Sequence, residues 1–199
     1  HCKQSKSCWK KRSFVMFRVL IIFFIFNLYN PVLSSTKEKI VSQMQLTNNL
    51  SFNFIQTIDD KKESGECIIK YPKKIWCKYN DSNKKIIISN GKYLVITTAN
   101  KGSYYRYPLK KTPLIFLLDK EYLISKMNIL EPREIENKYL NFKISENSNE
   151  INIFFDKNNL SLVGWQTEDI YQNLTITFIS SVKINQKIDN KIFILPKIN

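Results

Sequence analysis

Two apolar segments rich in β-branched residues, 85–89 and 92–98, flank the dipeptide Asn90-Gly91. Asn-Gly between two such segments is the strongest short-range signal for a β-hairpin, because both residues tolerate the backbone conformation of a tight hairpin turn. The hairpin is therefore the strongest local signal in the predicted fold.

Short strand-like segments recur before and after the hairpin. Residues 50–56 alternate between apolar and polar, and polar or Pro-containing turns separate the later segments. Consecutive short strands joined by tight turns predict an antiparallel meander. Strands are predicted over 50–56, 65–71, 75–79, 85–89, 92–98, 139–145, 150–155, 160–166, 173–180 and 191–195.

Helical patterns occur at two places only. At 36–48, Ile40, Val41 and Met44 fall on one stripe, and Ser35 or Thr36 can cap the helix. At Thr112-Pro113, a cap residue followed by Pro opens a strongly apolar segment, and a second apolar cluster follows from Tyr122. The sequence predicts one N-terminal helix and two short helices inserted between the halves of a sheet.

The N-terminal segment has the order of a secretory signal. Basic residues precede an apolar run at 19–26, Pro31 ends it, and small residues follow at Ser34 and Ser35. We expect a cleaved signal peptide over 1–34, of which 1–15 is a possible upstream extension, and a single exported domain over 35–199; the alternative is an uncleaved anchor or a buried core helix. Residues 28–36 contain no Cys, so we expect no lipid anchor of the bacterial lipoprotein type.

The formal net charge is +14, from 31 basic and 17 acidic residues. Six of the basic residues and none of the acidic ones precede Ser35, so the remaining chain carries +8. The charge is spread along the chain, and an exported protein does not meet nucleic acid, so nucleic-acid binding is not expected. Anionic phospholipid or an acidic partner suits a basic surface better.

The residues that enzymes need are scarce. His1 is the only histidine and precedes the predicted cleavage site, which excludes a nucleophile–histidine pair from the mature domain. The four glycines are isolated, so no phosphate-binding loop is present, and the carboxylate pairs Asp59-Asp60 and Glu168-Asp169 lie in polar, turn-like stretches. We expect no enzymatic activity, no cofactor and no metal.

Cys67 and Cys77 are the two cysteines of the predicted mature domain. Pairing Tyr71 with Ile75 around Pro72-Lys73-Lys74 makes the cysteines diagonal neighbours, with Cα atoms about 7–8 Å apart. A disulfide requires at most about 7 Å. Two buried free thiols are therefore predicted; the alternative is a disulfide, which an oxidising compartment would permit.

Five stretches, in order, resemble the LolA family of lipoprotein carriers. Phe52-x-Phe54-Ile55-Gln56 is similar to a first-strand Phe-x-Gln pattern, and the hairpin from Gly65 through Pro72 to Tyr79 is similar to that family's Gly-containing hairpin. The other three are Ile86 to Lys92, Tyr107 to Leu114, and the Asn173 to Phe178 strand together with the closing Phe193-x-Leu195-Pro196.

The resemblance implies a mainly β (α+β) fold: an unclosed antiparallel half β-barrel whose concave hydrophobic face is covered by short lid helices. It implies a monomeric carrier in the periplasm of a Gram-negative bacterium that takes the acyl chains of lipoproteins from the inner membrane to the outer membrane. The implied partners are acylated lipoproteins, an inner-membrane lipoprotein-releasing ABC transporter, and an outer-membrane receptor or the outer membrane itself. The alternative is a related half-barrel of the cell envelope that binds lipid or peptide for regulation and does not shuttle lipoproteins.

One position departs from the family pattern. Tyr71 stands where the family commonly has an Arg that holds the lid, and Tyr can donate only one hydrogen bond there. Strand alternation places a set of side chains on the inner face with Tyr71, and the apolar lid segment faces them. The predicted lipid-binding residues are Phe52, Phe54, Cys67, Ile69, Tyr71, Ile75, Cys77, Tyr79, Leu114, Ile115, Phe116, Leu117 and Leu118.

Overall fold

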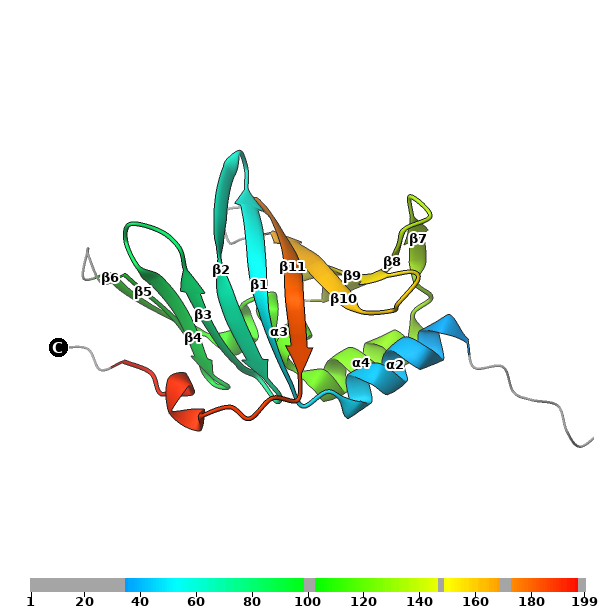
Figure 1. Cartoon of the computed structure of the whole chain (residues 1–199), viewed down its shortest axis with the longest axis horizontal. Helices are drawn as coiled ribbons and strands as arrows, with labels where there is room; N and C mark the ends of the chain where they lie inside the picture. Colours follow the sequence, from blue (N-terminus) through cyan, green and yellow to red (C-terminus); the bar gives the residue numbers. More distant parts are fainter. Residues whose placement is uncertain (1–34, 99–102, 147–148, 169–172, 197–199) are drawn as a thin grey trace, which may run out of the picture. The chain divides into compact units, whose positions relative to one another are not determined.

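The computed structural model describes residues 35–98, 103–146, 149–168 and 173–196 (Figure 1). These residues form an 11-stranded antiparallel sheet in the order β6-β5-β4-β3-β2-β1-β11-β10-β9-β8-β7. The edge strands β6 and β7 are not paired with each other, so the sheet is unclosed. The predicted half-barrel architecture is confirmed. The predicted signal peptide lies outside the described residues.

The sheet consists of two meanders that meet at its centre. The neighbours β1 and β11 come from opposite ends of the described chain and pair over most of their length (Figure 1). The strands are β1 (Asn49–Ile58), β2 (Lys61–Lys70), β3 (Lys74–Tyr79), β4 (Lys85–Asn90), β5 (Tyr93–Thr98), β6 (Ser103–Pro108), β7 (Arg133–Ile135), β8 (Tyr139–Glu146), β9 (Asn149–Asp156), β10 (Leu162–Glu168) and β11 (Leu174–Ile184).

The helices form as the sequence predicts. The first is α2 (Thr36–Leu46), where Ser35 and Glu38 form a reciprocal capping box and Ile40, Val41 and Met44 are buried. The inserted pair consists of α3 (Leu114–Leu118) and α4 (Lys120–Ile129), after a short 3₁₀ turn, η1 (Leu109–Lys111).

Helices α2 and α4 pack antiparallel, with polar contacts at both ends. At one end Lys37 forms an ion pair with Glu131. At the other end the Lys120 Nζ donates to the backbone oxygens of Gln45 and Thr47, each at 3.0 Å. No helix among the described ranges is long and apolar enough to cross a membrane.

The β2–β3 hairpin corrects the cysteine prediction. The turn closes one residue earlier on each arm than expected, so Lys70 pairs with Lys74 and Cys67 lies directly opposite Cys77. Their Cα atoms are 4.1 Å apart and the sulfurs form a disulfide. The prediction of free thiols was wrong because turn geometry, which sets the register of a hairpin, was misjudged.

The C-terminal strand predicted over 191–195 was also wrong. The chain leaves the sheet at Asn185, which has a positive φ of 54°, and residues Asn190–Phe193 form a 3₁₀ turn, η2. Strand β11 already has a neighbour on each side. Phe193 is instead buried as an anchor, with the Lys74 Nζ 5.8 Å from its ring centroid.

Sequence reasoning missed the two edge strands. β6 contains three tyrosines, one arginine and a terminal Pro108. Its sequence therefore lacks the alternation of apolar and polar residues that identifies a strand. Pro is tolerated there because an edge strand has one side without ladder hydrogen bonds. β7 is only three residues long, and short edge strands are a common way to limit unwanted pairing.

The disulfide yields a stability prediction. Cys67 and Cys77 enclose a loop with a sequence separation of 10, and a crosslink of this size stabilises a protein by about 2–3 kcal/mol. We expect dithiothreitol to lower the free energy of unfolding of the wild type by that amount in urea titrations. A Cys67→Ala/Cys77→Ala variant should show no response to dithiothreitol, and an equal response in both proteins would contradict the bond.

Candidate functional site

The candidate site is the inner face of the central strands. Strand register places Phe52, Cys67, Cys77 and Ile87 in one row across β1 to β4. The adjacent inner row is also apolar on the first three of these strands. We call the buried apolar side chains of this face the floor: Leu50, Phe52, Phe54, Cys67, Ile69, Ile75 and Cys77.

The lid consists of helices α3 and α4, and Leu114 at the start of α3 lines one cavity together with floor residues. Phe116, Leu117 and Leu118 of α3 are buried, and Leu114 and Ile115 are partly buried against the same core. Figure 1 shows α3 behind the sheet, between its two halves. Every residue predicted to bind lipid therefore belongs to one apolar cluster or packs against it, and their contact with a ligand stays a prediction.

A small cavity of about 60 Å³ remains between the floor and the lid. By comparison, an engineered apolar cavity of about 150 Å³ holds one benzene molecule. The closed cavity is therefore too small for an acyl chain. It is lined by Phe54, Gln56, Cys67, Ile75, Cys77, Tyr79, Ile87, Leu114, Trp165 and Thr177.

Gly65 lets two aromatic rings meet across the floor. It lies opposite Phe54 on one side and Tyr79 on the other, and these two rings touch edge-to-face with centroids 4.8 Å apart. A Cβ at position 65 would lie 2.8 Å from the Phe54 ring and 2.1 Å from the Lys78 backbone oxygen. The missing side chain of Gly65 is therefore required for this packing.

A row of polar side chains borders the floor, which sequence reasoning missed. Gln56 accepts from the Tyr79 hydroxyl at 3.0 Å and donates to the Thr177 Oγ1 at 3.1 Å. Glu63 forms an ion pair with Lys85. We call Gln56, Glu63, Tyr79, Lys85 and Thr177 the collar. Burial, together with the negative charges of Glu63 and Asp81, raises the pKa of the Tyr79 hydroxyl.

The β2–β3 turn is connected to the lid through Lys73. Its backbone N–H donates to the Leu118 oxygen at 2.8 Å, and its Nζ lies 2.9 Å from an Asp119 carboxylate oxygen. Asp119 also caps α4, because its side chain accepts from the Tyr122 N–H. The latch between hairpin and lid is therefore Lys73, two residues beyond the position that the family resemblance indicated.

Tyr71 does not take part in that latch through its hydroxyl. The side chain is buried, and its oxygen has no hydrogen-bond partner among the described residues. Burial raises the pKa of this hydroxyl, so it stays protonated. Tyr71 contributes packing instead, with the Lys120 ammonium 5.7 Å from its ring centroid.

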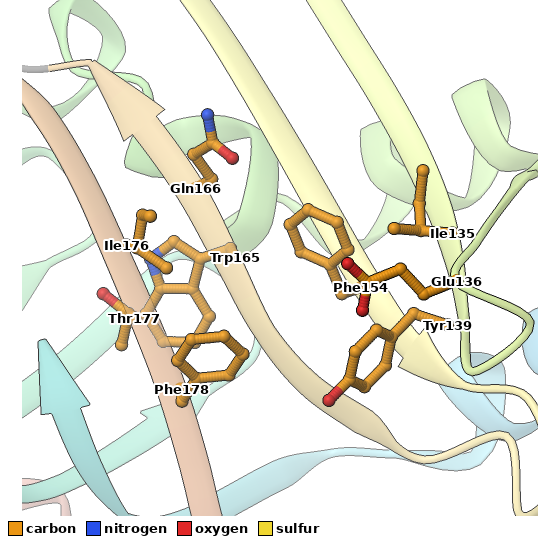
Figure 2. Close-up of a pocket in the computed structure, with 9 residues that line it drawn as sticks. All are labelled: Ile135, Glu136, Tyr139, Phe154, Trp165, Gln166, Ile176, Thr177 and Phe178. Atoms are coloured by element: carbon orange, nitrogen blue, oxygen red, sulfur yellow. The ribbon is translucent and has the colours of Figure 1, made fainter. Parts of the chain in front are cut away.

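A second pocket, of about 230 Å³, lies over β8 to β11 (Figure 2). Gly164 lies beside Phe154 on β9 and opposite Phe178 on β11, so no side chain fills the space between the two rings. Phe178 is exposed, whereas its neighbour Thr177 is buried, so this pocket opens on the outer face. Its lining residues are Ile135, Glu136, Tyr139, Phe154, Trp165, Gln166, Ile176, Thr177 and Phe178.

In the described part of the chain, no three His, Cys, Asp or Glu side chains gather into a possible metal site. The site is thus an apolar floor, an apolar lid and a polar border. Such an arrangement can bind an apolar ligand by exchange with the lid.

The family model of the outer membrane lipoprotein carrier protein LolA matches residues 45–195. The chain belongs to the LolA family. The match includes the floor, the lid and the collar, and it excludes residues 1–44. No curated protein matches the chain in sequence.

Several solved structures are similar to the chain. A LolA superfamily protein from Nitrosomonas europaea has 9% identity and a TM-score of 0.46, covering 81% of this chain and 99% of its own. A putative outer membrane lipoprotein-sorting protein domain from Vibrio parahaemolyticus has 8% identity and a TM-score of 0.44, covering 80% and 97%. The MucA/MucB complex structure of Pseudomonas aeruginosa has 7% identity and a TM-score of 0.41, covering 82% and 62%.

The Lys73 latch can be tested in this LolA-family lid. Lys73→Met removes the ion pair and keeps the backbone hydrogen bond. Because a partly exposed ion pair contributes about 0.2–1 kcal/mol, stopped-flow uptake of the apolar fluorophore N-phenylnaphthylamine should accelerate roughly 1.4- to 5-fold. The matched control is Lys157→Met, which removes an ion pair to Glu134 outside the lid. Equal uptake rates for wild type and Lys73→Met would refute the latch.

The Tyr71 hydroxyl gives a second test. A buried, unpaired hydroxyl destabilises a fold, so Tyr71→Phe should raise the free energy of unfolding by about 1 kcal/mol. The control is Tyr79→Phe, which removes the hydroxyl that donates to Gln56 and should lower stability. Urea titration measures both. A loss of stability in Tyr71→Phe would show that its hydroxyl has a partner.

Proposed function

We propose that this LolA-family chain is a non-enzymatic periplasmic carrier that binds the acyl chains of lipoproteins released from the inner membrane and delivers them to the outer membrane. One observation supports this most directly: the lid places side chains of the same apolar kind as an acyl chain against the floor, and the cavity between them among the described residues is only about 60 Å³. The lid occupies the space that the ligand needs.

Exchange with the lid makes the binding reversible. Burial of an acyl chain contributes about 0.8 kcal/mol for each methylene group, and a long chain without competition would not be released. When α3 must leave for the ligand to enter, the affinity is the difference between acyl contacts and lid contacts. Two short helices held by local polar contacts suit such a movement better than a strand of the sheet.

The export that carriage requires is part of the proposal. Residues 1–34 serve as a cleaved signal peptide, and residues 35–199 form the carrier domain. The Cys67–Cys77 disulfide supports an oxidising compartment such as the periplasm. An inner-membrane lipoprotein-releasing ABC transporter then loads the carrier, and an outer-membrane receptor or the outer membrane itself accepts the cargo.

A second candidate is a regulatory half-barrel that binds a polypeptide and does not shuttle lipoproteins. The observation that favours it is the outer pocket, whose aromatic lining includes the exposed Phe178 (Figure 2). A pocket of this kind can accept an apolar side chain of a partner. It opens on the face of the sheet opposite the lid and shares only Trp165 and Thr177 with the lining of the cavity under the lid, so Phe178 and Leu114 distinguish the two candidates.

Native mass spectrometry of protein purified from the periplasm, with and without an added acylated lipoprotein, tests the carrier function. We expect acylated cargo to co-purify with the wild type and to be lost from Leu114→Glu. Leu114 is a partly buried lid residue that lines the cavity, so a carboxylate there opposes an apolar ligand. The apparent affinity should fall at least about 10-fold, or 1.4 kcal/mol.

Phe178→Glu is the matched control, since it places the same charge on the outer face of the sheet. It should bind cargo as the wild type does. A lipid-free monomer that does not bind the added lipoprotein would favour the regulatory candidate. Loss of cargo from both variants would show that charge alone, and not its position on the inner face, prevents binding.

A further inference from the structure

The collar is a continuous feature of the sheet. Its five residues come one each from β4, β3, β2, β1 and β11, which are consecutive neighbours. Gln56 is paired with Glu63 on one side and Thr177 on the other. Along β1, Gln56 is the next inward residue after Phe54, so the collar begins one pleat beyond the floor.

The collar consists of polar side chains that are largely buried. The side chains of Glu63 and Lys85 are only 9% and 19% exposed, and Thr177 is 2% exposed. Burying an ion pair costs desolvation free energy that its own attraction scarcely offsets. A cavity that holds only hydrocarbon gains nothing from such a row, so the row indicates a ligand with a polar group.

The collar retains hydrogen-bond donors that can serve a ligand. The Gln56 amide uses one of its two N–H groups on Thr177. The Lys85 ammonium has three N–H groups and forms one ion pair among the described residues, with its Nζ 3.8 Å from the Tyr79 ring centroid. Gln56, which also lines the cavity, therefore has an N–H group to donate to a ligand acceptor.

A ligand that fits must offer acceptors next to hydrocarbon. Gln56, Tyr79 and Thr177 line the same small cavity as floor and lid residues, so an acceptor there would sit at the end of an apolar chain. Ester carbonyl oxygens of a diacylglyceryl group have this chemistry: they accept hydrogen bonds, cannot donate, and are attached directly to acyl chains.

We propose that the collar binds the ester carbonyl oxygens of a diacylglyceryl group, while the acyl chains lie on the floor. This subsite rests on the proposed carrier function and specifies its ligand. Gln56 donates its second N–H to a carbonyl oxygen, and Lys85 orients the group from the neighbouring strands. The collar thereby distinguishes an acylated ligand from hydrocarbon of equal length.

The test compares two ligands that differ only in their carbonyl groups. Dioctanoylglycerol has two ester carbonyls, and the diether dioctylglycerol has none. Each displaces N-phenylnaphthylamine from the mature protein, and displacement titrations give both affinities. One or two neutral hydrogen bonds predict that the ester binds roughly 2- to 10-fold more tightly than the ether.

The variants Gln56→Leu and Thr177→Val keep the size of each side chain and remove its polar group. Gln56→Leu should bring the ester-to-ether ratio close to 1 while the ether still binds, which shows that the cavity is folded. Thr177→Val should lower the ratio less, because Thr177 positions the Gln56 amide. Lys62→Met, which removes an exposed polar group from the outer face of β2, should keep the wild-type ratio.

The outcomes separate the two proposals. Failure of both ligands to displace the probe would overturn the carrier function itself. Displacement by both with equal affinity, or an unchanged ratio in Gln56→Leu, would overturn the collar and leave the carrier function standing. A diacylglyceryl-cysteine peptide and a dioctanoyl phospholipid, titrated last, identify the source of the ester group by which of them binds more tightly.

Discussion

The pairing of β1 with β11 is the contact on which the cavity depends. The strands β2 to β6 follow β1 as a local meander, and β8 to β10 precede β11 in the same way. Only β1–β11 joins the halves into one surface. Phe52 meets Trp165 across this junction, with ring centroids 6.0 Å apart, and Gln56 reaches Thr177 there. Any change that loosens the junction should disturb the floor and the collar together.

A curved sheet with one apolar face cannot remain uncovered in water, and this requirement explains the position of the helices. The segment between β6 and β8 supplies α3 and α4, which return over the floor. Buried leucines hold the lid in place, and polar contacts from Lys73 and Lys120 fix where it sits. Apolar attraction sets the strength of closure, whereas these directional contacts set its geometry.

Sequence patterns predicted the elements that depend on local periodicity. The hairpin around Asn90-Gly91 forms, with Gly91 at a φ of 97° in a four-residue loop between the paired Ser89 and Leu94, and the α2 stripe is buried as expected. The inward face of the β2–β3 hairpin was also predicted correctly. The predicted pairing of the two strands was shifted by two residues, and a shift of two keeps every side chain on the same face of the sheet. The same shift moved Cys77 away from Cys67, so the disulfide was missed. The collar was beyond prediction, since Gln56 and Thr177 are separated by 121 residues and no local pattern relates them.

The lid and the collar impose opposite requirements on a ligand. Leu114 of the lid lines the cavity beside Gln56, Tyr79 and Thr177, and its hydrocarbon side chain cannot accept a hydrogen bond. In the closed state Leu114 packs with the floor and offers the collar no hydrogen-bond acceptor. In the proposed carrier, an acyl ester would contact both the floor and the collar, so its advantage over the lid would lie at the polar border and not in the apolar contacts that lid and ligand share. Selectivity and release would then have separate origins: the collar would set which ligand binds, and the lid would limit how tightly it is held.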